Sequence, residues 1–255
     1  MTHAARPVRG PVNLKIVGGF MAMAMKLINR DAHLPGLGVC HGPSGYGKTQ
    51  ASIFARNMTG AIVVEVGDSW NKKILLQRIL FELGEQSPKG RTIGELSMQA
   101  SEILGRDPNR PLIVDEADRL VDKGLVEIIR ELHEMSQAPV ILIGEEELPR
   151  KLLRIERVHN RVLEWFPAEP CDGADARLLA DALCPNVEIA NDLVELIRQQ
   201  ADGRARRIVV NLARIAEAAR NEDVARFDVG SWGDRGFYTG EPPAPRATSL
   251  YRRAA

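Results

Sequence analysis

Short, continuous apolar segments alternate along the first two thirds of the chain with longer segments in which apolar residues recur every three or four positions. Continuous runs of Val, Ile and Leu are typical of strands that are buried on both faces of a parallel sheet. The three-to-four spacing indicates amphipathic helices. Five strands are therefore predicted, at residues 37–40, 61–66, 111–115, 139–144 and 162–166.

Helices are predicted before the first strand and between the strands, at residues 13–28, 50–57, 74–83, 92–104, 121–136 and 146–160. Thr92 and Glu95 have the spacing of a capping box, which supports a helix start at that point. Strands that alternate with helices favour a mostly parallel sheet with helices on both faces. The pattern therefore predicts an α/β fold for this part of the chain.

From residue 174 onward the apolar spacing is helical throughout, which predicts helices at 174–183, 190–201 and 204–221. We expect this region to form a small all-α domain, the lid. The chain is divided into an N-terminal arm, an α/β domain, the helical lid and an irregular tail, at residues 1–12, 13–168, 169–223 and 224–255. The aromatic and basic residues of the tail are expected either to dock on a partner or to be disordered.

The composition is that of a globular chain, with 44% hydrophobic and 27% charged residues and with 34 basic residues balancing 34 acidic ones. Basic residues gather in the first thirty positions and at 203–220, where they can contact nucleic acid or form a solvated helix face. No apolar segment approaches the roughly 20 residues of a membrane span, so no membrane partner is expected. Three scattered cysteines favour reduced thiols and a cytoplasmic location.

A phosphate-binding motif of the form G-x-x-x-x-G-K-[S/T] follows the first strand and precedes a helix, the context that this motif requires. Its glycines allow backbone N–H groups to point at phosphates near the start of the helix. Lys48 is expected to reach the β- and γ-phosphates, and Thr49 to hold Mg²⁺. We predict an ATP–Mg²⁺ site formed by Gly42, Pro43, Ser44, Gly45, Tyr46, Gly47, Lys48, Thr49 and Gln50.

Two acidic residues, Asp115 and Glu116, end the third predicted strand. This is the Walker B pattern, in which Asp115 would enter the Mg²⁺ shell and Glu116 would orient or polarise the attacking water. Residues 115–118 also spell Asp-Glu-Ala-Asp, the helicase box of that name. Those helicases need two tandem α/β domains, whereas only a small helical lid follows here. The motifs therefore favour Mg²⁺-dependent ATP hydrolysis.

The order of P-loop, Asp-Glu pair, one further strand and helical lid resembles the AAA+ ATPases over residues 13–221. The resemblance implies an AAA+ P-loop NTPase core of five mostly parallel strands. It also implies an arginine finger that acts on the nucleotide of a neighbouring subunit. Arg161 lies at the corresponding position, with Arg154 and Arg157 as alternatives, and a solvated basic helix remains open.

Two sensors of the triphosphate are implied by the same resemblance. The lid sequence from Gly203 to Arg206 resembles the family's G-x-x-R second sensor, with Arg207 one position away. The first sensor, at the end of the fourth strand, is usually Asn, Ser or Thr. That strand ends here with Gly144 followed by Glu145, so Glu145 is the nearest candidate.

Three segments, 33–49, 68–73 and 138–149, resemble the ATPase subunits of Mu-like transposable phages, relatives of the Mu B and Tns C transposition regulators. The resemblance implies a bacterial host cytoplasm and a homo-oligomer, a helical filament that ATP-bound subunits form on double-stranded DNA. It also implies that this filament selects target DNA and recruits a transposase, which stimulates hydrolysis.

In related assemblies the loop after the second strand faces the central axis. Trp70, Lys72 and Lys73 are therefore expected along the DNA, with Lys89 and Arg91 as weaker candidates. The alternative is that Trp70 packs under the sheet and the lysines are solvated. Two other functions stay open, a helicase loader or replication initiator, and a nucleotide-gated DNA scaffold without significant turnover.

Overall fold

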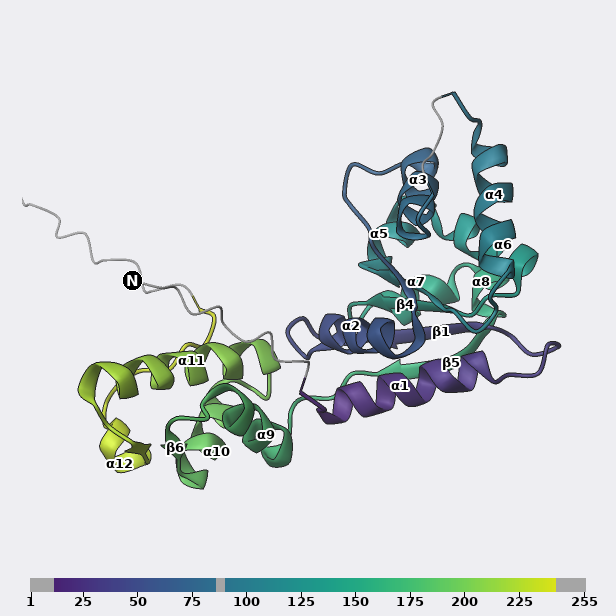
Figure 1. The fold of residues 1–255 in the computed structure, drawn as a ribbon. Helices are drawn as coiled ribbons and strands as arrows, with labels where there is room; N and C mark the ends of the chain where they lie inside the picture. The colour runs from purple at the N-terminus through teal and green to yellow at the C-terminus, as the bar shows by residue number, and fades with distance from the viewer. Residues whose placement is uncertain (1–11, 86–89, 242–255) are drawn as a thin grey trace, which may run out of the picture.

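A five-stranded parallel sheet lies at the centre of the α/β part (Figure 1). The structure is a computed structural model and describes residues 12–85 and 90–241. The strands follow the order β2-β3-β4-β1-β5, and every neighbouring pair is parallel. They are β1 (Leu37–His41), β2 (Ile62–Glu65), β3 (Leu112–Asp115), β4 (Val140–Gly144) and β5 (Val162–Pro167). This order places the carboxyl ends of β1, β3 and β4 together at one edge, where ligands of open α/β sheets bind.

Both faces of the sheet are covered by helices, because alternate residues of each strand enter different hydrophobic clusters. Ile113 and Ile141 pack on one face with α1 (Lys15–Ile28) and α2 (Lys48–Thr59). Val114 and Leu142 pack on the other. The helices of that second face are α3 (Lys72–Glu82), α4 (Ile93–Gly105), α5 (Ala117–Asp122), α6 (Val126–Ser136), α7 (Leu148–Leu153) and α8 (Glu156–His159). Burial on both faces explains why the strands read as continuous apolar runs.

The helix predicted at 121–136 is in fact two helices, α5 and α6. The chain breaks at Gly124, whose φ of +63° is a left-handed conformation that helix interiors do not contain. Apolar residues on both sides of Gly124 continue the helical spacing, so the pattern alone did not reveal the break. The first of the two helices, α5, begins at Ala117, directly after Asp115 and Glu116.

The helix predicted at 146–160 is also two helices, α7 and α8. Ile155 separates them with φ −118° and ψ 77°, outside the helical region, and its side chain packs against the core. Most other predicted boundaries lie within about two residues of the observed ones. The predicted capping box is confirmed, since Thr92 and Glu95 each bond to the other's backbone N–H at the start of α4.

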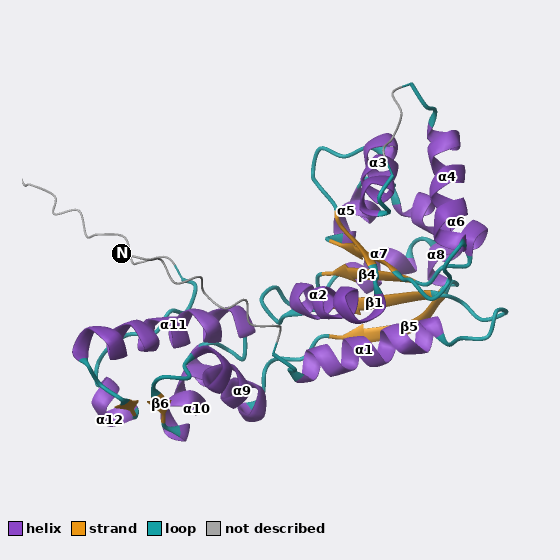
Figure 2. Cartoon of the chain, in the orientation of Figure 1, coloured by secondary structure: helices purple, strands orange, loops and turns teal. Residues whose placement is uncertain are grey.

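The region after the sheet is mostly helical, with α9 (Gly173–Leu183), α10 (Asn191–Gln200) and α11 (Ala205–Glu222), as Figure 2 shows. The expectation of helices alone was wrong, because a short parallel pair, β6 (Glu188–Ile189) and β7 (Arg226–Phe227), joins it. Two residues per strand are too few to show a period-two pattern.

The tail expected to be irregular from residue 224 begins with ordered structure. After β7, the short helix α12 (Val229–Trp232) buries Trp232, whose ring packs edge-on against Phe227 with centroids 5.7 Å apart. Aromatic burial therefore extends the folded region beyond the predicted boundary. The arm at 1–11 and the tail residues 242–255 lie outside the described residues.

The helical region contacts the α/β part at the start of α1. The backbone N–H of Lys15 donates a 2.8 Å hydrogen bond to the buried Asp175 carboxylate of α9. Leu14, at the N-cap of α1, offers no side-chain cap, so Asp175 supplies this bond from another part of the fold. Within the described ranges, no helix combines the length and the apolar character that crossing a membrane requires.

Candidate nucleotide-binding site

The loop from Gly42 to Thr49 joins β1 to α2 and is shaped by glycine backbone conformations. Gly42, Gly45 and Gly47 have φ values of +146°, +88° and +94°, a region that other residues rarely adopt. A Cβ on Gly42 would lie 3.1 Å from the carbonyl oxygen of Ala168, closer than ordinary van der Waals contact, so a side chain there would also crowd Ala168. Helix α2 begins immediately after Gly47. A glycine-rich turn that opens a helix fits a nucleoside polyphosphate.

Lys48 is the first residue of α2, and its ammonium group bends back over the loop. Its Nζ donates to the carbonyl oxygens of Gly42 and Pro43, the latter at 2.9 Å. Burial lowers the pKa of Lys48, while the nearby Asp115 and Glu145 carboxylates are among the groups that oppose this shift. The ammonium therefore lies among the groups predicted to bind phosphate and metal.

Thr49 and Asp115 meet directly, although 66 positions separate them in the chain. The Thr49 hydroxyl donates a 2.9 Å hydrogen bond to the Asp115 carboxylate, which is buried at the end of β3. An oxygen from a hydroxyl and one from a carboxylate fit Mg²⁺, which keeps most of its remaining ligands as water and substrate phosphate. These two residues would hold the metal beside the phosphates.

Glu116 follows Asp115 in a left-handed conformation, with φ +58°. Its backbone N–H donates to the Asp115 carboxylate at 2.9 Å, which helps to orient the Asp115 side chain. Burial raises the pKa of Glu116, and the positive charge of Arg119 opposes that rise. A carboxylate beside the metal position is suited to polarise water.

Arg119 is a residue that sequence reasoning missed. Its Nη2 lies 3.8 Å from the Glu116 carboxylate, while its other nitrogens bond to the Val66 carbonyl (2.6 Å) and to Asp68 (3.0 Å). It therefore joins the predicted hydrolytic carboxylate to the loop after β2. The only signal available was its position one helical turn after Glu116.

Glu145, the candidate first sensor, follows β4, whose last residue Gly144 pairs with His41 at the end of β1. Its backbone N–H donates a 2.6 Å hydrogen bond to Asp118, which also pairs with Lys151 at 3.3 Å. The Glu145 side chain is exposed, and its charge acts on Lys48. The structure thus places Glu145 near Lys48, the lysine predicted to bind phosphate.

Two lid arginines contact the phosphate-binding loop. The backbone N–H of Arg206 donates to the Gly45 carbonyl at 3.1 Å, and the Arg206 side chain is exposed. Arg204, predicted only as one of the basic residues at 203–220, donates from Nη1 to the Ser44 carbonyl at 2.7 Å and lies over the Tyr46 ring, 5.8 Å from its centroid. The start of α11 is therefore fastened to the loop by both residues.

The alternative lid arginine is engaged elsewhere. Arg207 forms an ion pair of 2.9 Å with Asp202, just before the turn at Gly203. Its side chain is only 24% exposed. The geometry therefore favours Arg206 over Arg207 as the lid residue available to a triphosphate.

Arg161 lies at the opposite edge of the sheet from the phosphate-binding loop. Its carbonyl accepts a 2.9 Å hydrogen bond from Leu37, the first residue of β1, whereas the loop follows the last residue, His41. The intervening strand spans about 13 Å at roughly 3.3 Å per residue. The Arg161 guanidinium forms a 2.7 Å ion pair with Glu134 of α6. Arg154 and Arg157 are exposed and make no ion pair with any described residue.

Three of the residues expected along DNA, Trp70, Lys72 and Lys73, lie around the start of α3. Asn71 caps this helix by accepting from the N–H groups of Lys73 (3.0 Å) and Ile74 (3.1 Å), so Lys72 and Lys73 belong to its first turn rather than to a loop. Trp70 is partly buried and packs against the core. This position agrees with the packing alternative for Trp70. Lys89 lies outside the described residues.

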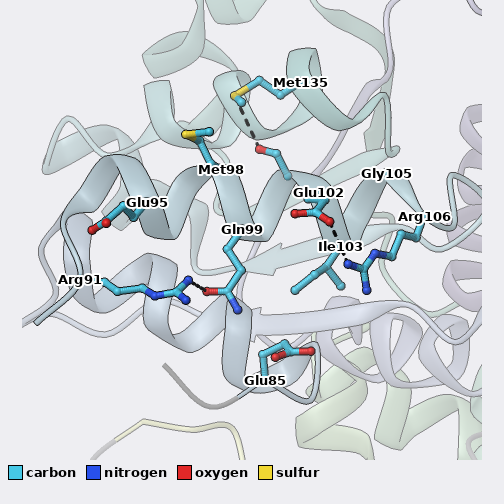
Figure 3. Close-up of a pocket in the computed structure, with 11 residues that line it drawn as sticks. Glu85, Arg91, Glu95, Met98, Gln99, Glu102, Ile103, Gly105, Arg106 and Met135 are labelled. Carbon is cyan, nitrogen blue, oxygen red and sulfur yellow. Dashed lines mark hydrogen bonds and ion pairs between the residues drawn. The ribbon is translucent and has the colours of Figure 1, made fainter. Parts of the chain in front are cut away.

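An open hollow of about 990 Å³ lies along α4 (Figure 3). Arg91 forms part of its wall and donates a 2.6 Å hydrogen bond to Gln99. Met98 and Met135 supply apolar surface. No residue of the phosphate-binding loop lines this hollow. Arg91 is therefore separate from the candidate nucleotide site.

Residues 31–152 match a family model described as AAA domain. In structure, the chain resembles Cdc6p from Pyrobaculum aerophilum with a TM-score of 0.63 and 17% identity, over 87% of this chain and 66% of that one. For the Aeropyrum pernix Orc1 protein, solved in complex with DNA, the TM-score is 0.61 and the identity 19%, over 87% and 64%. For the RuvB Holliday junction branch migration motor of Thermotoga maritima, the values are 0.56 and 17%, over 84% and 63%.

The chain spans somewhat less than two thirds of the length of each of these structures. At identities below 20%, these likenesses concern the fold. No curated protein matches the sequence significantly. The parallel sheet, the phosphate-binding loop and the family match agree: residues 31–152 match the AAA domain, and the chain has the AAA+ P-loop NTPase fold with a helical C-terminal region.

Proposed function

We propose that this protein is a Mg²⁺-dependent ATPase whose subunits assemble head to tail on double-stranded DNA. The observation that carries the proposal is the meeting of Thr49 and Asp115 beside Lys48. Lysine for the phosphates, two oxygen ligands for the metal and a carboxylate for the water are the parts that phosphoryl transfer to water needs. Glu116 supplies that carboxylate.

Assembly is supported by the position of Arg161. A basic residue at the far edge of the sheet is poorly placed for its own nucleotide but well placed for one bound to a neighbour. Contacts between unlike edges are heterologous, and they generate rings or helical filaments. Arg206 acts in the same subunit and reports the nucleotide to the lid.

Binding to DNA is supported by Lys72 and Lys73 in the first turn of α3. The positive end of a helix adds to the attraction of two lysines for phosphate. The fold likeness to the Orc1 protein, solved in complex with DNA, agrees with this class of ligand.

The biological setting that we favour is DNA transposition, with a transposase as the partner that stimulates hydrolysis. Its support is the sequence resemblance of residues 33–49, 68–73 and 138–149 to Mu-like phage ATPase subunits. A second candidate is a replication initiator or helicase loader. The fold likeness to Cdc6p and Orc1 favours that candidate.

Electron microscopy of the purified protein with random-sequence duplex DNA, in ATP and separately in ADP, tests the shared part of the proposal. We expect filaments on DNA with ATP and none with ADP. Closed rings that do not bind DNA, or monomers with both nucleotides, would overturn the proposal that the subunits assemble on DNA. ATP turnover measured with a Mu-like phage transposase and with a hexameric replicative helicase then separates the two settings, since only the true partner should stimulate hydrolysis.

A further inference from the structure

Glu134, on α6, holds two arginines at once. One carboxylate oxygen lies 2.7 Å from Nη2 of Arg161, and the other accepts a hydrogen bond from Nη1 of Arg130. Arg130 is bound in turn by Glu127 at 2.7 Å. The three side chains Arg130, Glu134 and Arg161 therefore form a charged chain at the edge of the sheet remote from the phosphate-binding loop.

Glu134 forms its ion pair with Nη2, one of the two terminal nitrogens of the Arg161 guanidinium. An arginine that stabilises a phosphate does so through these terminal nitrogens, often with two parallel (bidentate) hydrogen bonds. A carboxylate and a phosphate therefore compete for the same part of Arg161. While the ion pair with Glu134 is made, Arg161 cannot present its full fork of donors to another anion.

Release of Arg161 is easy in this arrangement. Arg161 and Glu134 side chains are 41% and 36% exposed, and ion pairs with such exposure contribute little because water and salt screen them. When Arg161 leaves, Glu134 keeps its bond to Arg130, so no carboxylate is left without a partner. The pair can therefore hold the arginine in place without preventing its transfer.

We propose that Glu134 is a positioning residue that keeps Arg161 retracted until the nucleotide of a neighbouring subunit takes its place. This inference rests on the proposed function, since it needs Arg161 to act between subunits. In this arrangement the Glu134 carboxylate and the γ-phosphate bound to the next subunit compete for Arg161, and the active site is complete only when the γ-phosphate binds it.

The test is the ATPase rate of Glu134→Gln as a function of protein concentration, at saturating ATP and fixed duplex DNA. Because the amide removes the competing charge, the half-maximal rate should occur at a protein concentration up to about fivefold lower than in the wild type, the range expected for an exposed ion pair. The maximal rate per subunit and the KM for ATP should not change. Glu131→Gln, a neighbouring exposed carboxylate 3.9 Å from Arg130, is the matched control and should behave as wild type.

A half-maximal concentration that stays the same or rises in Glu134→Gln would overturn the inference. Glu134→Asp, which keeps the charge but shortens the side chain, should shift the concentration in the same direction as Glu134→Gln. A loss of thermal stability with a lower maximal rate in both variants would show a merely structural role and would also overturn it.

Arg161→Ala separates this inference from the function on which it rests. If Arg161→Ala is inactive alone but regains activity when mixed with Lys48→Ala subunits, the arginine acts between subunits, and the Glu134 variants then decide the inference. If Arg161→Ala keeps the wild-type rate at all concentrations, the assignment of Arg161 in the proposed function fails and the inference fails with it.

Discussion

The Thr49 hydroxyl donates a 2.9 Å hydrogen bond to the carboxylate of Asp115. This contact joins the start of α2 to the end of β3 across the carboxyl edge of the sheet, where β4 lies between β1 and β3. Two motifs that are far apart in the chain thus form one site. Thr49 and Asp115 would hold a divalent cation here, because hydroxyl and carboxylate oxygens are the ligands that Mg²⁺ prefers.

Lys48→Ala should weaken binding of Mg-ATP roughly 100-fold, because a charged hydrogen-bond donor to phosphate is lost from a partly buried position. Isothermal titration calorimetry measures the change. Arg106→Ala, which breaks an exposed ion pair with Glu102, is the control and should bind normally. An unchanged Kd in Lys48→Ala would contradict the assignment of the loop.

Glu116→Gln should bind ATP within about threefold of the wild type but hydrolyse it at least about 100-fold more slowly, because the amide cannot accept a proton from water. Single-turnover assays with labelled ATP separate the two effects. Complexes with DNA should persist in this variant. Rapid hydrolysis and disassembly would show that another group polarises the water.

Arg204→Ala should raise the KM for ATP about tenfold with little change in kcat, because Arg204 fastens the lid to Ser44 and Tyr46 of the phosphate-binding loop. Steady-state kinetics and nucleotide dissociation rates are the measurements. Arg207→Ala removes a neighbouring guanidinium that pairs with Asp202 instead, and we expect a KM close to wild type. Equal effects from both variants would point to general lid destabilisation.

Replacing Lys72 and Lys73 together by Ala should weaken duplex binding on any sequence. The slope of log K against log salt should fall by about 2, one for each phosphate contact. Fluorescence anisotropy at several salt concentrations measures both quantities. Arg106→Ala, at the C-cap of α4 and paired with Glu102, serves as control. A salt slope equal to that of the wild type would exclude these lysines from the DNA contact.

Stability should fall below about pH 6.5 partly because of His133. Burial lowers the pKa of this histidine, and the nearby charges of Arg30 and Arg161 lower it further, against the hydrogen bond with the Ala138 carbonyl. Its contribution to stability is therefore fully present above the unfolded pKa of about 6.5 and is lost as the pH falls toward the lower folded value.

His133→Gln should accordingly show a lower Tm than the wild type at pH 8 but a smaller decrease in Tm between pH 8 and pH 5.5. Differential scanning fluorimetry over this range checks the expectation. His41, whose pKa burial also lowers, remains in the variant, so some pH dependence should persist. A decrease as steep as in the wild type would show that other groups control the acid transition.

The sheet and the phosphate-binding loop could be predicted closely because their chemistry is local. Residues other than glycine rarely adopt the φ values of Gly45 and Gly47, and the capping box of Thr92 uses Glu95 three residues later. Such constraints involve residues that lie close together in the sequence, so a sequence pattern reveals them. The helix breaks at Gly124 and Ile155 escaped prediction because apolar residues continue the helical spacing across them.

The contacts that Arg119 and Arg204 make could not be predicted from the sequence pattern. Arg119 bonds to the Val66 carbonyl, 53 positions away, and Arg204 to the Ser44 carbonyl, 160 positions away. The acceptor in both contacts is a backbone carbonyl. Every residue carries one, so the sequence does not indicate which carbonyl an arginine will bind. Only the three-dimensional fold identifies these contacts.

Arg161 and the phosphate-binding loop lie at opposite edges of one sheet, so each subunit in a head-to-tail assembly shows a different chemical surface to each neighbour. One terminal subunit holds a nucleotide that no neighbouring arginine reaches, and the other terminal subunit offers an arginine with no nucleotide to act on. Such an assembly is polar. In the assembly that we propose, subunits at the two ends would therefore retain ATP for different times, and growth and loss would proceed at different rates at the two ends.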